Sequence, residues 1–151
     1  MLHLYNVKRS EDGLSYTFTT RFNITYKLAL TTYLLGEVNA FSLSLYPESE
    51  PQQVDYWIKN TVIKIIGDIL AKDSNVIFYV CDSEDEREDQ RHKVFEYWFV
   101  KASVGYTYIK KYNYCITSEN GYNLNSSILY NADNYLENYT IDEFKIALGM
   151  S

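Results

Sequence analysis

Apolar side chains occupy almost every even-numbered position between Tyr16 and Leu30, while threonine and charged residues fill most of the odd ones. An alternation with a period of two puts the two sets of side chains on opposite faces of an extended chain, so it predicts β-strands. One strand of this length would exceed the usual limit of roughly 10 residues. We therefore expect a turn at residues 21–23, within a hairpin whose strands cover residues 14–20 and 24–33.

Hydrophobic spacing and turn signals predict the remaining elements. In chain order they are a connection at 34–39, a strand at 40–46, a helix from 49 to 72, a strand at 75–81, a helix at 84–102, strands at 106–117 and 126–131, and a short helix opening at 140. This order, βββ-α-β-α-ββ-α, predicts an α+β fold with a largely antiparallel sheet and helices packed on it. The 151 residues suit one domain, residues 1–151.

Three local patterns carry the finer predictions. Ser49, followed by an early proline, is expected to cap the first helix, and Thr140 with Glu143 forms a capping box for the last one. The run from Asn75 to Cys81 is apolar at both odd and even positions, which is typical of a strand covered on both faces.

Charge and the apolar runs exclude several classes of partner. The formal charge of −6 disfavours nucleic acid and anionic membranes, both of which attract basic surfaces. No apolar run approaches the roughly 20 residues that span a bilayer, and the first residues lack a secretory signal pattern. We expect a soluble, cytoplasmic protein in which Cys81 and Cys115 are buried, reduced thiols.

The junction between the 75–81 strand and the next helix is the least generic feature of the sequence. Helical spacing places Arg87 and Arg91 on the apolar face of the predicted helix, where unpaired charge is costly. One interpretation is structural, with the guanidinium groups reaching the domain edge and pairing with carboxylates. The other is an anion or carboxylate pocket, where the helix N-terminus and the two arginines converge on a ligand and Asp82 and Asp85 are further candidate binding residues.

The residues present argue against three more specific kinds of site: a cysteine phosphatase, a metal site and a nucleophilic enzyme. Cys81 and Arg87 have the spacing of cysteine phosphatases, but the loop between them holds four carboxylates, which would repel a phosphate. A stripe formed by Asp85, Asp89, His92 and Glu96 is better explained as a solvated helix face than as a metal site. No nucleophile motif or glycine-rich phosphate loop occurs. We therefore assign no catalytic residue, no metal and no cofactor.

The same junction resembles an uncharacterised family of small proteins found mainly in Bacteroidota, a domain of unknown function. The similar residues are Cys81, Asp82, Asp85, Arg87, Arg91, Phe95, Trp98 and Phe99 at the junction, with Phe18, Thr20 and Tyr26 before it. The order of elements is similar too, but Glu86 stands where a glycine is expected, which disfavours anion binding. The resemblance implies an α+β domain and no particular activity.

Two hypotheses for function remain. The first is a non-enzymatic binding or accessory protein, supported by the 16 tyrosines, since tyrosine is enriched in interface cores. Its partner would be another protein or a second copy of the chain, met by tyrosines without a task in the predicted strands: Tyr122, Tyr130, Tyr135 and Tyr139. The second is a hydrolase-like enzyme or an anion-binding protein that uses the Cys81–Arg91 junction.

Overall fold

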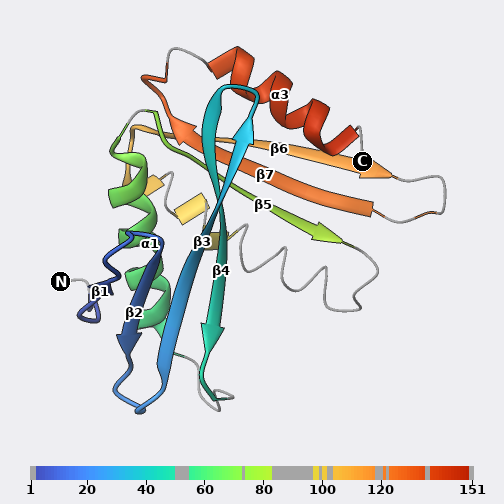
Figure 1. Ribbon diagram of the computed structural model, residues 1–151. Coiled ribbons are helices and arrows are strands. Elements are labelled where there is room, and N and C mark those ends of the chain that lie inside the picture. The colour runs from blue at the N-terminus through green and yellow to red at the C-terminus, as the bar shows by residue number, and fades with distance from the viewer. Residues whose placement is uncertain are drawn as a thin grey trace.

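A seven-stranded sheet, strongly twisted and carrying helices on both faces, organises the chain in this computed structural model (Figure 1). The structure describes residues 3–49, 55–72, 74–82, 97–98, 100–101, 104–117, 121, 123–134 and 137–149. Its elements are β1 (Lys8–Arg9), β2 (Ser15–Thr19), β3 (Thr25–Leu35), β4 (Val38–Pro47), α1 (Tyr56–Leu70), β5 (Val76–Asp82), β6 (Ile109–Thr117), β7 (Asn123–Asn131) and α3 (Glu137–Gly149). The α+β class and the predicted order of elements are confirmed.

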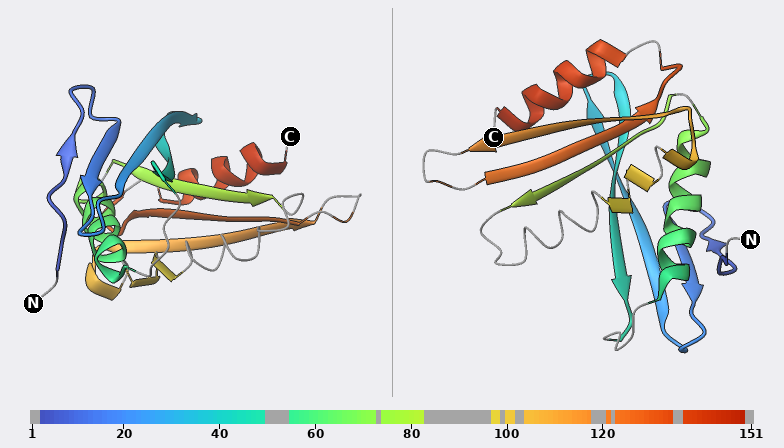
Figure 2. Two further views of the ribbon diagram at one scale, coloured as in Figure 1. Left: turned by 90° about the horizontal axis from the view of Figure 1, so that it is seen from below. Right: turned by 180° about the vertical axis from the view of Figure 1, so that it is seen from behind.

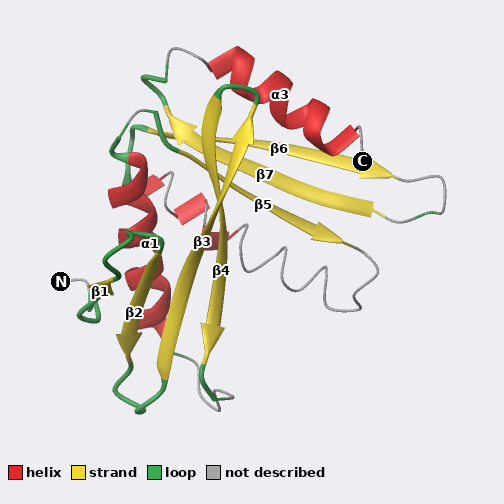
Figure 3. Cartoon of the chain, in the orientation of Figure 1, coloured by secondary structure: helices red, strands yellow, loops and turns green. Residues whose placement is uncertain are grey.

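The strands lie in the order β1-β2-β3-β4-β5-β7-β6, and every neighbouring pair except β4 and β5 is antiparallel. The helix α1 connects the two parallel strands, as a parallel pairing requires. The described residues of the 97–105 segment are helical, and Figure 3 shows them as short pieces beside α1.

The predicted first hairpin is confirmed, with its turn at residues 21–23 and Asn23 at a φ of 62°. The connection predicted at 34–39 is wrong. β3 continues to Leu35 and β4 begins at Val38, so only Gly36 and Glu37 form the turn. Gly36 has a φ of 62°, which suits the first central position of a two-residue hairpin turn. The short strand β1 was not predicted, because two residues carry no periodicity.

The central strand β5 is covered on both faces, as its sequence predicts. Val76 and Ile77 are adjacent in the strand, and both are fully buried, but they belong to different hydrophobic clusters. Successive side chains of a strand point to opposite faces. One cluster therefore lies on each face of the sheet.

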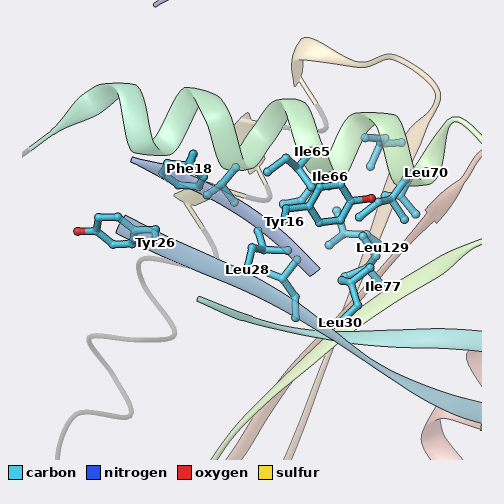
Figure 4. Packing of buried hydrophobic residues seen from close by; sticks show 14 residues of the cluster. Tyr16, Phe18, Tyr26, Leu28, Leu30, Ile65, Ile66, Leu70, Ile77 and Leu129 are labelled. Atoms are coloured by element: carbon cyan, nitrogen blue, oxygen red, sulfur yellow. The ribbon is translucent and has the colours of Figure 1, made fainter. Parts of the chain in front are cut away.

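The first cluster joins the sheet to α1 (Figure 4). Tyr16, Phe18 and Leu28 from β2 and β3 pack against Ile65, Ile66 and Leu70 of α1, with Trp98 partly buried at the margin. The second cluster, around Phe144 of α3, lies on the other face. Figure 2 accordingly shows α3 and the 97–105 segment on opposite sides of β5, β6 and β7.

Asp55, rather than Ser49, caps α1, so the predicted start of this helix is wrong. The Asp55 carboxylate accepts a hydrogen bond from the Trp57 backbone N–H at 3.0 Å. It also accepts one from the Tyr5 hydroxyl. Ser49 lies before the described part of the helix and is not helical. The acid directly before the helical spacing is the better cap, because a cap must bond the first free N–H groups.

Side chains at or next to the ends of β5, β6 and β7 bond the last carbonyls of α1. Asn75 and Asn131 donate their amide N–H groups to the carbonyls of Ile69 and Leu70, each at 2.8 Å. The Tyr108 hydroxyl donates to the Gly67 carbonyl at 2.9 Å. The bonds to Ile69 and Leu70 satisfy carbonyls at the end of the helix, where helical partners run out. The Gly67 carbonyl also accepts from the Ala71 N–H at 2.9 Å, so the Tyr108 bond is an additional contact that holds the helix near the start of β6.

The helix α3 begins at Glu137, one turn before the predicted capping box. Thr140 is fully buried inside the helix, and its Oγ1 has no hydrogen-bond partner among the described residues. The prediction that Thr140 is a cap is therefore wrong. The apolar spacing of this helix predicts that Ile141, Phe144, Ala147 and Leu148 point inward. Packing in the second cluster confirms Ile141, Phe144 and Leu148, whereas Ala147 is exposed and its predicted position is wrong.

Candidate functional site

The strand-to-helix junction is only partly within the described residues. Asp82 is the last residue of β5, where it pairs with Leu124 of β7. Asp85, Arg87 and Arg91 lie outside the described residues. The ion-pair network and the anion pocket therefore both remain predictions for this junction.

Of the four tyrosines predicted to form a partner surface near the C-terminus, the structure describes two. Tyr130 is only 4% exposed and belongs to the second hydrophobic cluster, so its ring is not available to a partner. Tyr139 is partly exposed, and its hydroxyl accepts a hydrogen bond from the Glu37 N–H at 3.0 Å. Tyr122 and Tyr135 lie outside the described residues, so their role at a surface remains a prediction.

Tyr130 is expected to make the fold less stable at high pH. Burial, and then the bond from its hydroxyl to Glu137 Oε1 at 2.8 Å, raise the pKa of Tyr130 far above the ordinary value of about 10. The unfolded chain loses this proton as pH rises through about 10, while the folded chain keeps it. The free energy of unfolding should therefore fall above this pH.

Urea unfolding between neutral pH and pH 11 tests this prediction. We expect Tyr130→Phe to flatten the decline relative to the wild type, although the variant starts from a lower stability. A smaller decline should remain, since burial also raises the pKa values of Tyr5, Tyr26 and Tyr108. An equal decline in both proteins would contradict the assignment.

Cys115 corrects one half of the prediction of two buried thiols, while the burial of the Cys81 side chain lies outside what the structure describes. Cys115 is a free cysteine, and its side chain is exposed on the edge strand β6. The apolar run around it belongs to a strand with no neighbour beyond it in the described sheet. An apolar run predicts buried side chains when its strand is central in a sheet, but not when the strand lies at the edge, as β6 does.

Exposed apolar residues gather instead where α1 meets the described helical residues of the 97–105 segment. On that segment Tyr97, Val100 and Val104 are 49%, 43% and 73% exposed. Their spacings of three and four residues place them on one helix face. Tyr56, on the first turn of α1, is 69% exposed.

Two lysines connect these residues into one surface. Lys59 Nζ lies 5.8 Å from the centroid of the Tyr56 ring and 5.5 Å from that of Tyr97. Lys101 Nζ lies 5.4 Å from the Tyr97 ring. Ammonium groups at such distances are attracted by the faces of aromatic rings. We call the set Tyr56, Lys59, Tyr97, Val100, Lys101 and Val104 the lysine–tyrosine surface.

Partly buried neighbours hold the lysine–tyrosine surface in place. Ile58 of α1 and Trp98 of the second helical segment, each adjacent in sequence to a member of the surface, pack against the first cluster. The backbone that carries the exposed rings is therefore fixed by packing against the first cluster. None of the six residues is acidic, which distinguishes the surface from the chain as a whole.

Sequence reasoning missed this surface, although a signal was present. The helical spacing that puts Arg87, Arg91 and Trp98 on one face also gathers Tyr97, Val100 and Val104 on a second face. A helix with a second apolar stripe has more apolar surface than one sheet can cover. That excess is a sign of a binding surface.

Two further properties limit the chemistry of the described residues. They include no group of three or more His, Cys, Asp or Glu side chains that could hold a metal ion. Across the same ranges, no helix combines the length and the apolar character needed to cross a membrane. His3, which the sequence left unassigned, stacks on Trp57 with 4.4 Å between ring centroids.

The fold and this surface define an α+β protein with an exposed apolar and basic helical face. The chain belongs to the family of unknown function DUF6169, whose match covers residues 54–145. The matched range includes both helical parts of the lysine–tyrosine surface and excludes all of β1 to β4. No curated protein and no solved structure matches the chain.

Proposed function

We propose that this protein is a non-enzymatic binding protein that docks an acidic, apolar segment of a partner protein on the lysine–tyrosine surface. The observation that carries the proposal is the exposure of Tyr56, Tyr97 and Val104 on adjoining helical elements. Clustered aromatic residues supply most of the binding energy in protein interfaces. Isolated exposed apolar residues are ordinary, whereas a contiguous group is typical of an interaction site.

Charge selects the kind of partner. Lys59 and Lys101 are the only charged members of the surface, and both lie against tyrosine rings. A segment with carboxylates beside its large apolar residues would pair with the lysines and cover the rings. Charge complementarity of this kind adds specificity and speeds association. We further propose that the protein acts in the cytoplasm, where an exposed thiol such as Cys115 stays reduced.

A peptide-display selection on the purified full-length chain tests the proposal. We expect the selected peptides to combine acidic residues with two or more large apolar residues. Their affinity should fall about tenfold or more in Tyr56→Ser, because a central aromatic anchor is lost. Lys59→Gln should weaken binding and reduce its sensitivity to salt.

Tyr46→Ser is the matched control, because Tyr46 is also exposed, at 56%, but lies at the end of β4. It should leave affinity unchanged. Tyr56→Ser should also keep its free energy of unfolding within about 0.5 kcal/mol of the wild type, as exposed positions usually do. Selection of basic peptides, or an equal loss in both variants, would overturn the proposal. A wild-type dimer that Tyr56→Ser dissociates would replace the partner protein with a second copy.

A further inference from the structure

A groove of about 440 Å³ opens beside the outer edge of β2. Leu4, Tyr5 and Asn6 form one wall, and Thr17, Phe18 and Thr19 form the other. Lys8 also lines it, and carries the only charged side chain of the lining. The volume lies within the ~300–1,000 Å³ of ligand pockets, and the groove belongs to the strands outside the family match.

The groove exists because α1 draws the N-terminal segment away from β2. The Tyr5 N–H donates to Thr61 Oγ1 at 3.0 Å, and the Asn60 side chain donates to the His3 carbonyl at 3.3 Å. The Tyr5 hydroxyl donates to the buried carboxylate of Asp55. The pairing of β1 with β2 consequently ends at Lys8 and Thr17, two residues before β2 itself ends.

The register of β2 aims the backbone of Thr19 into this groove. Thr20 N–H donates to the Ile24 carbonyl at 2.9 Å, so even-numbered residues of β2 exchange their bonds with β3. Odd-numbered residues then direct their N–H and C=O groups outward, as the bond from Ser10 N–H to the Ser15 carbonyl shows. Within the described chain, β1 stops too early to pair with Thr19.

We propose that this groove binds the carboxyl-terminal end of an extended peptide, added to β2 as a short antiparallel strand. An incoming strand beside Thr19 lies in line with β1, so Lys8 blocks its continuation and only a chain end can fit. The Lys8 ammonium group favours a terminal carboxylate and repels a terminal amine. Backbone bonds to Thr19 supply the remaining recognition, as in other cases of strand addition.

An array of N-acetylated pentapeptides with free carboxyl termini, and the same array as carboxyl-terminal amides, provides the probes. We expect the full-length protein to bind a subset of the free acids, and each matching amide about tenfold or more weakly, since the charged bond to Lys8 is lost. Lys8→Met should cause a similar loss. Lys27→Met is the matched control, because Lys27 pairs with Thr17 from the other side of β2 and does not line the groove.

Thr19→Pro tests the strand addition separately. It removes the outward N–H and leaves the backbone bonds between β2 and β3 in place, although the 2.8 Å bond between the Thr19 and Thr25 hydroxyls is lost. Proline is tolerated on edge strands. We expect at least about tenfold weaker binding of the best free acid. If this variant fails to fold, the comparison of Lys8→Met with Lys27→Met decides. Equal binding of acids and amides, no binding of either array, or an equal loss in both lysine variants would overturn the proposal.

Discussion

Phe144→Ala is expected to lower the free energy of unfolding by about 3–5 kcal/mol, the cost of emptying a buried phenylalanine site. Phe144 is 1% exposed and is the largest fully buried side chain of the protein's described residues. Its ring lies 6.0 Å from that of Phe78 and packs with residues of β3, β4, β5 and β7. The other buried members of that cluster come from strands, so Phe144 is the main anchor of α3.

Urea unfolding monitored by far-ultraviolet circular dichroism measures this effect. Ile146→Ala is the control, because Ile146 lies on the same helix but is 48% exposed. It should change stability by no more than about 0.5 kcal/mol. A cost below about 1 kcal/mol for Phe144→Ala would mean that α3 is not packed as described, since burial of a whole ring is worth more.

The fold could be predicted from the sequence wherever an element has a buried face. Alternation between Tyr16 and Leu30 sets the first hairpin, and the doubly apolar run at Val76 and Ile77 marks the central strand. Element ends were less accessible. Asp55 caps α1 through the bond from the Trp57 N–H, and the Tyr5 hydroxyl, 50 residues away in the chain, also donates to its carboxylate. No local pattern contains that contact.

The candidate sites were less predictable than the fold. Tyrosine content suggested a binding surface, but exposure depends on which elements lie side by side. Tyr130 is covered by α3, whereas Tyr56 and Tyr97 meet at Lys59 on the open side of two helical segments. The groove at β2 depends on the early end of a two-residue strand. Such a strand leaves no trace in the sequence.

The first turns of α1 position both proposed binding sites. Tyr56 and Lys59 contribute to the lysine–tyrosine surface, while Asp55, Asn60 and Thr61 hold the N-terminal segment that walls the groove. The two sets alternate along the same turns of one helix. Fraying of these turns would therefore disturb both sites, even though their proposed ligands differ.

Gly36→Ala is expected to destabilise the protein by about 2–4 kcal/mol, more than its exposed turn suggests. Gly36 has a φ of 62°, which an alanine adopts only with strain. An added Cβ would also lie 2.2 Å from the Tyr139 hydroxyl and 2.9 Å from Cδ of Glu143. Moving Tyr139 would break its bond with the Glu37 N–H, which connects the β3–β4 turn to α3.

Gly121→Ala separates the two causes of this loss. Gly121 has a φ of 83°, but an added Cβ there meets no atom of the described residues within 4 Å, so only the conformational cost of about 1 kcal/mol should remain. Gly36→Ala combined with Tyr139→Phe should cost less than the sum of the two single changes, because the hydroxyl that collides is gone. Equal losses in the two glycine variants, with simple additivity in the double variant, would mean that the turn is not packed on α3. The larger loss at Gly36 would instead show that a two-residue turn, read from sequence as a plain connection, is part of the packing between the sheet and its terminal helix.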